Sequence, residues 1–201
     1  MTQVDPGSAP GWFRRALEVP FEDREVTVAG TAIHYLYWAQ REALPGLVLV
    51  HGNGAHAHWW RFLAPFFLKE YRVAALDLSG MGDSGHREHY SPELFAEEVM
   101  AVARDAGFGS DTIVVGHSFG GFVTIQTALH FGHELAGVVL VDSPVRPPDY
   151  AWERDPKRSP IRAKRVYPDR ATAEARFRLM PPQDCENAYI LRYIATHSVM
   201  E

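Results

Sequence analysis

Short apolar runs alternate with amphipathic segments along most of this 201-residue chain. Apolar and polar positions alternate in residues 24–28 and 32–38, on either side of Ala29-Gly30, which predicts an antiparallel hairpin. Four later runs are short and almost wholly apolar, as expected for strands that are covered on both faces of a sheet. These runs are residues 47–50, 72–76, 112–115 and 137–141.

Helix-compatible segments separate these predicted strands. The middle one, at about 91–106, opens with Ser91, Pro92 and Glu93, which supply a capping side chain, a first-turn proline and a first-turn acid. Strands that alternate with helices through short links predict an α/β fold. Its sheet is expected to be mainly parallel, with an antiparallel N-terminal hairpin and flanking helices. The other two predicted helices lie at about 58–69 and 119–131.

The composition changes at both ends of this pattern. Residues 1–21 hold several prolines and glycines, which indicates an irregular lead-in before a core over residues 22–145. Beyond the core the chain is rich in proline and charge, and no strand signal returns. Two helices are predicted there, at about 170–179 and 184–199, and the second carries an apolar stripe. We therefore predict that residues 146–201 form a separate helical segment.

Composition and charge narrow the class of protein. The chain is 46% hydrophobic and 22% charged, which is typical of a globular domain, and its formal net charge of −5 gives no indication of nucleic-acid binding. These residues include no apolar run of 18 and no apolar leader, so we expect neither a membrane span nor a secretory signal, and a cytoplasmic location is the default. The single cysteine cannot form an internal disulfide. The histidines show no metal-ligand spacing, so we expect no metal site.

The most specific chemical signal is the sequence Gly116-His117-Ser118-Phe119-Gly120. It follows an apolar strand and precedes a helix-compatible run, which is the context of a nucleophile elbow. Glycines allow a sharp turn that lifts the serine hydroxyl above the sheet edge, and the new helix directs backbone N–H groups to the same place. The alternative interpretation is a serine that caps the helix within a glycine-rich turn.

Two further segments accompany the elbow in a consistent order. His51-Gly52-Asn53-Gly54 directly follows a buried strand, and Asp77-Leu78-Ser79-Gly80-Met81-Gly82-Asp83-Ser84 matches the pattern D-x-x-G-x-G-x-S. Together with the elbow they resemble the α/β-hydrolase superfamily, particularly its small esterase-like members with a helical cap. The resemblance covers about residues 22–145, and it implies that residues 146–201 belong to the cap.

The resemblance implies a role for each of these motifs. Ser118 is expected to be the nucleophile, activated by a base that removes its proton. The family stabilises the oxyanion with two backbone N–H groups, which correspond to Phe119 and Asn53, with Gly54 as the alternative in the same loop. Asp77 is expected to organise its own glycine-rich loop. A small acyl substrate and no cofactor are implied.

Other side chains are candidates for the acid, the base and the substrate pocket. Asp142 ends the last predicted strand, where some family members carry the catalytic acid, and an acid at this point also commonly caps the following turn. His51 and His117 flank the motifs, but the family uses neither as the base, so both are expected to hydrogen-bond local backbone. We expect an apolar acyl pocket formed by Gly52, Gly54, Trp59, Trp60 and His117.

By resemblance, a family member continues after the cap with two more strands, two more helices and the loop that carries the base. We therefore expect the chain to hold the N-terminal two-thirds of a hydrolase, as a fragment, a truncated gene product or half of a two-chain enzyme. The strand at 137–141 would then form a sheet edge. A homodimer or a complementing C-terminal chain is the expected protein partner.

The expected function is hydrolysis of an ester or a related small acyl substrate. A serine at the elbow argues against epoxide hydrolase and haloalkane dehalogenase chemistry, which needs a carboxylate nucleophile. The alternatives are a C–C hydrolase or perhydrolase of the same fold, and a non-catalytic binding protein on this scaffold.

Overall fold

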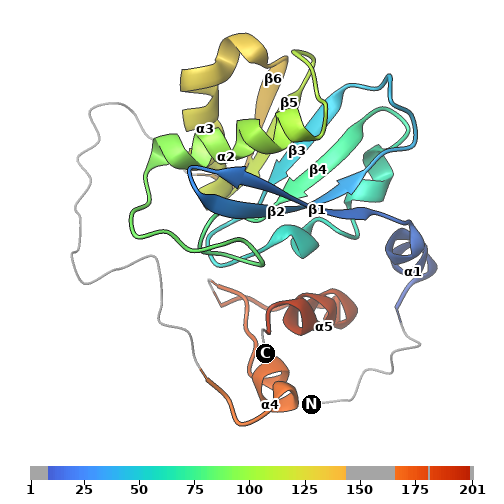
Figure 1. Cartoon of the computed structure of the whole chain (residues 1–201). Helices are drawn as coiled ribbons and strands as arrows, with labels where there is room; N and C mark the ends of the chain where they lie inside the picture. The colour runs from blue at the N-terminus through green and yellow to red at the C-terminus, as the bar shows by residue number, and fades with distance from the viewer. Residues whose placement is uncertain (1–8, 144–165, 181, 200–201) are drawn as a thin grey trace.

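The computed structural model describes residues 9–143, 166–180 and 182–199. At its centre is a six-stranded sheet in the order β1-β2-β4-β3-β5-β6 (Figure 1). β1 and β2 pair antiparallel, as do β2 and β4, whereas the remaining neighbours pair parallel. The predicted α/β fold with an antiparallel N-terminal hairpin is therefore confirmed. The strands are β1 (Glu22–Val28), β2 (Thr31–Trp38), β3 (Gly46–Val50), β4 (Arg72–Leu76), β5 (Ile113–His117) and β6 (Gly137–Val141).

The central strands are apolar at almost every position because both faces of the sheet are covered. Val48 and Val50 pack on the side of helices α2 (Pro92–Asp105) and α3 (Phe119–Phe131). On the opposite face, Leu47 and Leu49 belong to a second cluster with residues from η2 (Ala57–Trp59) and η3 (Ala64–Phe67), which are 3₁₀ turns. This layering places the carboxyl ends of β3 and β5 side by side, with the sheet held from both faces.

The single helix predicted over residues 58–69 is wrong. The segment forms η2 and η3 instead, joined by turns in which Leu63 and Ala64 both donate to the carbonyl of Trp60. Pro65 explains the difference, because it has no N–H and its ring clashes with the carbonyl four residues earlier in an α-helix. The apolar spacing was helical, but the proline prevents a continuous helix.

The irregular lead-in predicted for residues 1–21 is also wrong over α1 (Gly11–Glu18). Pro10 stands just before the helix, where its missing N–H costs nothing. Phe13 and Ala16 are buried against the rest of the protein. The Arg61 guanidinium donates to three carbonyl oxygens at the end of the helix, those of Ala16, Leu17 and Val19. Tertiary contacts therefore stabilise a helix whose flanks look irregular.

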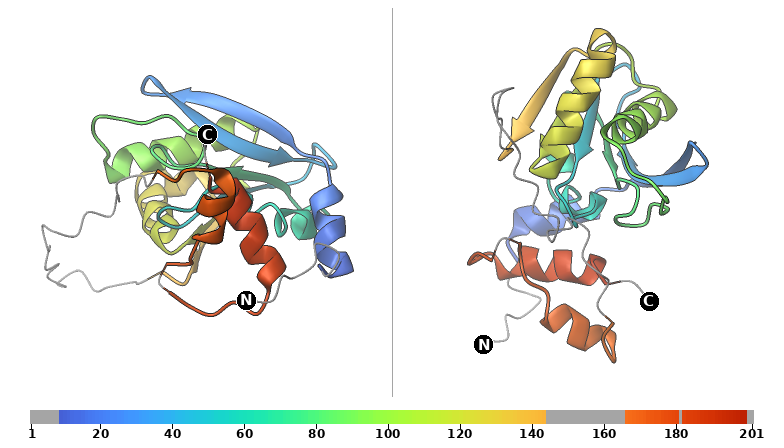
Figure 2. Two further views of the ribbon diagram at one scale, coloured as in Figure 1. Left: turned by 90° about the horizontal axis from the view of Figure 1, so that it is seen from below. Right: turned by 90° about the vertical axis from the view of Figure 1, so that its left-hand side faces the viewer.

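Two helices, α4 (Arg170–Ala175) and α5 (Ala188–His197), lie below the sheet in the view of Figure 1, and α5 is the nearer to it (Figure 2). Their presence is as predicted, although both are shorter than expected. Ile194 of α5 packs in a third cluster with Phe62 and Phe13. The predicted boundary at residue 145 lies outside the described residues, so the division into core and cap segments stays a prediction. Within the described part of the chain, no helix is long and apolar enough to cross a membrane.

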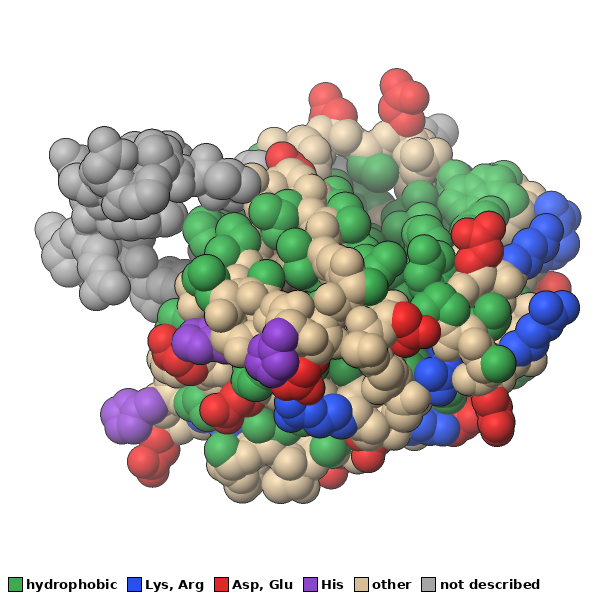
Figure 3. Space-filling model, turned by 90° about the horizontal axis from the view of Figure 1, so that it is seen from above, with side chains coloured by type: hydrophobic (Ala, Val, Ile, Leu, Met, Phe, Trp, Pro, Cys, Tyr) green, Lys and Arg blue, Asp and Glu red, His purple; other side chains and the backbone are tan. Residues whose placement is uncertain are grey.

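β6 forms one edge of the sheet. Three of its valines, Val138, Val139 and Val141, are 39–46% exposed, which is unusual for an apolar strand. By contrast, the face seen in Figure 3 shows hydrophobic side chains interspersed with separate acidic, basic and histidine side chains. β6 therefore has an outer edge that no strand of the described residues pairs with, together with exposed apolar side chains.

Candidate active site

Ser118 occupies a strained turn between β5 and α3. Its φ is 52° and its ψ is −114°, a backbone conformation that non-glycine residues rarely adopt. The Ser118 N–H donates to the carbonyl of Val141 at 2.9 Å, and the Ser118 carbonyl accepts from Gly121 N–H at 2.9 Å and from Ser143 Oγ at 3.0 Å. Three hydrogen bonds thus hold the backbone in the sharp turn that an elbow requires.

Two glycines around Ser118 are required by close packing. A Cβ at Gly116 would overlap the carbonyl oxygen of Gly120 and Thr124 Oγ1. A Cβ at Gly120 would overlap the carbonyl oxygens of Val50 and His51. These positions let α3 approach β3 and β5 closely, which sets the direction in which the helix N-terminus points.

The loop after β3 passes directly beside the elbow. A Cβ added to Gly52 would lie 3.2 Å from His117 Nδ1 and 3.4 Å from Ser118 Cβ. Further along the loop, the N–H of Gly54 donates to Met81 Sδ at 3.4 Å. The fold therefore brings together two motifs that lie more than 60 positions apart in the sequence.

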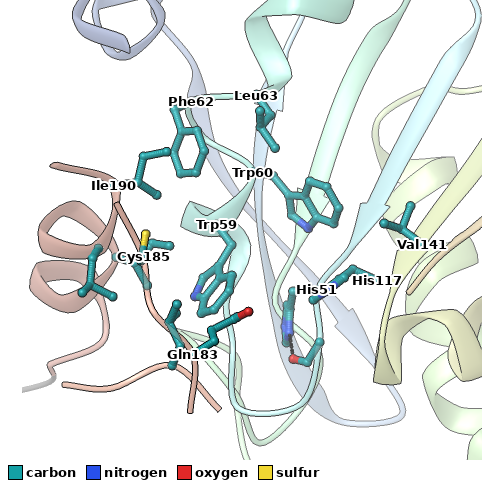
Figure 4. Close-up of a pocket in the computed structure, with 14 residues that line it drawn as sticks. His51, Trp59, Trp60, Phe62, Leu63, His117, Val141, Gln183, Cys185 and Ile190 are labelled. Carbon is teal, nitrogen blue, oxygen red and sulfur yellow. Dashed lines mark hydrogen bonds between the residues drawn. The ribbon is translucent and has the colours of Figure 1, made fainter. Parts of the chain in front are cut away.

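His51 makes the local backbone contacts expected of it. Its Nδ1 donates to the carbonyl of Gly52 at 2.7 Å, and its Nε2 accepts from the N–H of Leu78 at 3.1 Å (Figure 4). Burial lowers the pKa of His51, in keeping with a neutral ring that donates through one nitrogen and accepts through the other. Because both nitrogens are occupied, His51 is not available as a base.

Asp77 organises its own loop, as predicted, and also reaches the loop after β3. One carboxylate oxygen accepts from Ala57 N–H at 2.6 Å, and the other accepts from Asp83 N–H at 3.0 Å and from His34 Nδ1 at 2.7 Å. Burial alone would raise the pKa of Asp77, but the hydrogen bond from His34 and the other donors hold it below its usual value. Asp77 is therefore an ionised carboxylate that is only 1% exposed.

The same region contains a group of three side chains whose nitrogen and oxygen atoms could bind a metal ion. The ligand atoms of His34, Asp77 and Asp83 lie within 4.8 Å of one another, the one such group in the part of the chain that the structure describes. Both ring nitrogens of His34 are engaged, however, with Asp77 on one side and Asp23 on the other. Neither nitrogen faces a vacant ligand position, so the group is an ion-paired network.

A pocket of about 360 Å³ lies between the elbow and α5, and its lining is mostly apolar (Figure 4). Four of the five residues predicted for the acyl pocket contribute to it, whereas Gly54 does not. The contribution of α5 was not predicted, although the apolar stripe on that helix was the available signal. The core contributes Gly52, Trp59, Trp60 and His117, and α5 contributes Ile190, Leu191 and Ile194.

A row of histidines joins the core to α5, a contact that was not predicted from the sequence. His56 Nε2 lies 2.9 Å from Ser198 Oγ, and His58 Nδ1 lies 3.0 Å from the Tyr193 hydroxyl. The rings of His58 and His197 stack with centroids 4.1 Å apart. Burial, reinforced by the neighbouring histidines, lowers the pKa of His56 to about 4 and that of His58 to about 3. We refer to His56, His58 and His197 as the histidine seam.

The remaining candidates lie around the elbow without forming a triad. Asp142 is exposed, has a φ of 49°, and follows the residue that pairs with His117 across β5 and β6. Phe119 packs edge-on against Phe95 with ring centroids 5.6 Å apart. Among the described residues, no histidine is hydrogen-bonded to Ser118 Oγ.

Comparison with known proteins agrees with this architecture. A model of the alpha/beta hydrolase family matches residues 47–197, which is more than half of the chain. The chain belongs to this family. A thioesterase domain from a curacin biosynthetic pathway, solved as a structure, superposes with a TM-score of 0.68 at 24% identity over 89% of this chain and 67% of its own. The fold is therefore the α/β-hydrolase fold.

Curated relatives of the chain are named as hydrolases of different kinds. A pimeloyl-[acyl-carrier protein] methyl ester esterase from Edwardsiella ictaluri is 34% identical over 53% of this chain and 40% of its own length. Epoxide hydrolase 4 from Homo sapiens is 27% identical over 58% of this chain and 32% of its own length. The chain thus spans well under two thirds of these relatives.

Proposed function

We propose that the protein is a serine hydrolase that cleaves an ester or a related small acyl substrate through Ser118. The observation that carries the proposal is the strained backbone of Ser118 between a strand and a helix, with glycines on both sides where an added Cβ would overlap backbone atoms. Strain of this kind persists only where the surrounding structure enforces it, and it concentrates at functional sites. Its relatives include esterases, and the elbow carries a serine where carboxylate chemistry would need an aspartate.

In this mechanism Ser118 Oγ attacks the substrate carbonyl carbon while a base takes the hydroxyl proton. The carbonyl oxygen becomes an oxyanion, and collapse of the tetrahedral intermediate expels the alcohol, which receives that proton. Water then releases the acid from the acyl-enzyme by the same steps. Phe119 is the first residue of α3, so its N–H has no partner within the helix and is suited to the oxyanion. Asn53 N–H is the second proposed donor, because Asn53 follows Gly52, which lies beside Ser118 in the loop after β3.

The base is proposed to come from outside the described residues, either from another part of the protein or from a second chain. His51 is occupied by backbone, and His56 and His58 bond to Ser198 and Tyr193 of the C-terminal segment. Asp142 remains the candidate acid, since it lies at the end of the strand beside β5.

The substrate is proposed to carry a small, uncharged, apolar acyl group. The pocket beside the elbow has a volume of about 360 Å³, at the lower end of the range for small-molecule sites. Trp59, Trp60 and Ile194 contribute apolar surface, and among the described residues that line it there is no lysine, arginine, aspartate or glutamate. A charged acyl group would lose its hydration there without gaining an ion pair.

A fluorophosphonate probe and an ester assay on the complete protein test the proposal together. The wild type is expected to be labelled rapidly and to hydrolyse short-chain p-nitrophenyl esters. Ser118→Ala should abolish labelling and lower kcat by several orders of magnitude, since members of a triad act as a unit. Near-full activity in Ser118→Ala would contradict the assignment.

The same experiment separates the hydrolase from a non-catalytic binding protein on this scaffold. That second candidate is favoured by one observation, namely that no histidine of the described residues bonds to Ser118 Oγ. A binding protein would react with the probe slowly, and its residual ester turnover would not depend on Ser118. It would still take up an apolar ligand in the pocket, which quenching of tryptophan fluorescence would detect.

A further inference from the structure

We infer that His34 is a positioning residue, held as an imidazolium between Asp23 and Asp77, and that it fixes the loop from Gly52 to Ala57 beside Ser118. The inference rests on the proposed function, because this loop carries the proposed oxyanion donor. His34 lies on β2 and touches neither the pocket nor Ser118 in any of its contacts.

Both ring nitrogens of His34 face carboxylates. Nδ1 lies 2.7 Å from Asp77 Oδ2, and Nε2 lies 2.8 Å from Asp23 Oδ1. An ionised carboxylate only accepts hydrogen bonds, so two such contacts require both nitrogens to donate, and only the protonated ring does so. The His34 side chain is 9% exposed, whereas that of Asp23 is 69% exposed. The ring is therefore a mostly buried cation with one buried and one surface counter-charge.

The charged groups around His34 favour its protonated form. Burial on its own would lower the pKa of His34, but Asp77 and Asp23 raise it to about 9. Two more acids favour the cation: Glu25 lies opposite His34 on β1, and Asp83 lies beside Asp77 in the following loop. His58 is the nearby basic group, and its lowered pKa keeps it neutral. His34 is thus expected to stay protonated through neutral pH.

Asp77 connects His34 to the loop. Its other carboxylate oxygen accepts from Ala57 N–H at 2.6 Å, which anchors the far end of the loop. The near end is anchored from the adjacent residue, because Leu78 N–H donates to His51, which in turn donates to the Gly52 carbonyl. The segment 77–78 therefore holds the loop at both ends, and His34 supplies the charge that balances the buried carboxylate.

Loss of the His34 proton would disturb this arrangement. Without the cation, Asp77 is left as a buried carboxylate with reduced compensation, and it would draw in water. That change weakens its bond to Ala57 N–H. A loop displacement of about 1 Å near reacting groups costs about 10²-fold in rate, and a weakened anchor should cost somewhat less.

The test compares three variants of the complete protein. His34→Gln removes the charge and one of the two donors. Asp23→Asn keeps an acceptor on the surface side but removes the outer charge, and its exposed position leaves folding intact. His89→Gln is the matched control, since it makes the same change at an exposed histidine. Each is measured for kcat and KM across pH, for His34 titration by NMR of ring-labelled histidine, and for hydrogen exchange at Ala57 N–H.

The expected results link titration, exchange and catalysis. The wild type should lose kcat as the pH rises through about 9, in step with the His34 titration. Asp23→Asn should lower the His34 pKa and move the alkaline limb of kcat down with it. His34→Gln should lower kcat by ~10- to 100-fold with little change in KM, and Ala57 should exchange faster, while His89→Gln resembles the wild type.

Two results would overturn the inference. One is a His34 that titrates near its ordinary value of 6.5 in the wild type. The other is an Ala57 exchange rate and a kcat in His34→Gln equal to those of His89→Gln. If no Ser118-dependent turnover is found, the proposed function fails on its own, and the titration and the exchange rate still decide whether His34 holds the loop.

Discussion

At the scale of single residues, the glycines of the elbow give the most specific prediction. Gly120→Ala adds a Cβ that overlaps the carbonyl oxygens of Val50 and His51, which are backbone atoms of β3 and the loop after it and cannot turn aside. We expect the free energy of unfolding to fall by ~1–3 kcal/mol, the usual cost of overpacking. Gly132→Ala is the control, because a Cβ there meets no atom within 4 Å. Equal denaturation midpoints for the two variants would show that α3 can move away from β3.

Single residues also show how far sequence alone reaches. Ser118, Asp77 and His51 were assigned their surroundings correctly because their motifs encode local backbone turns, and a turn needs only neighbours in the chain. His34 carried no such signal. Its role depends on the register that sets β1 against β2 and on Asp77, which follows β4 and lies 43 residues later in the sequence. A contact between one histidine and two carboxylates cannot be predicted until those strands are aligned.

At the scale of elements, the histidine seam makes the docking of α5 sensitive to pH. His56 and His58 have pKa values lowered to about 4 and about 3, so the docked state favours their neutral forms. The resulting stability is complete above the unfolded value of about 6.5 and declines as the pH falls toward 4, by up to ~1.4 kcal/mol per histidine and pH unit. His197, His51 and His34 add repulsion, and Asp77 opposes it.

Hydrogen exchange of α5 at pH 7.5 and pH 5 measures this effect. Backbone amides of α5 should exchange faster relative to those of α2 at the lower pH, after correction for intrinsic rates. His58→Gln keeps a partner for the Tyr193 hydroxyl but cannot be protonated, so it should flatten the pH dependence. His130→Gln, at an exposed position on α3, should leave it unchanged. An α5 equally protected at both pH values would exclude the seam as a pH-sensitive contact.

The predictions of helices and strands succeeded where the apolar pattern agreed with the positions of prolines and glycines. The parallel strands were found because a run of four or five almost wholly apolar residues between turns has few other interpretations. The helix over 58–69 failed because apolar spacing was weighed above Pro65, and α1 was missed because the prolines and glycines around it were weighed above Trp12, Phe13 and Ala16. In both cases backbone chemistry and side-chain pattern disagreed. Pro65 decided the first outcome locally, whereas contacts distant in sequence decided the second.

At the scale of the whole molecule, the open edge of β6 predicts that this 201-residue chain, expressed by itself, will associate with a second copy. Val138, Val139 and Val141 are 39–46% exposed, and no described strand pairs with the outer edge. Such an edge lacks the lysines, prolines and bulges that normally prevent strands from pairing between molecules.

Light scattering coupled to size-exclusion chromatography, over concentrations from about 1 to 100 μM, should reveal dimers or larger species. Val139→Lys places a charge on the edge strand and should restore the monomer. Leu129→Lys is the matched control, because Leu129 is 72% exposed and belongs to helix α3 rather than to the edge strand. If the two lysine variants dissociate the chain equally, general apolar exposure drives association. If the unmodified chain is a monomer throughout, the edge is not a contact surface, and the exposed valines of β6 are tolerated in water.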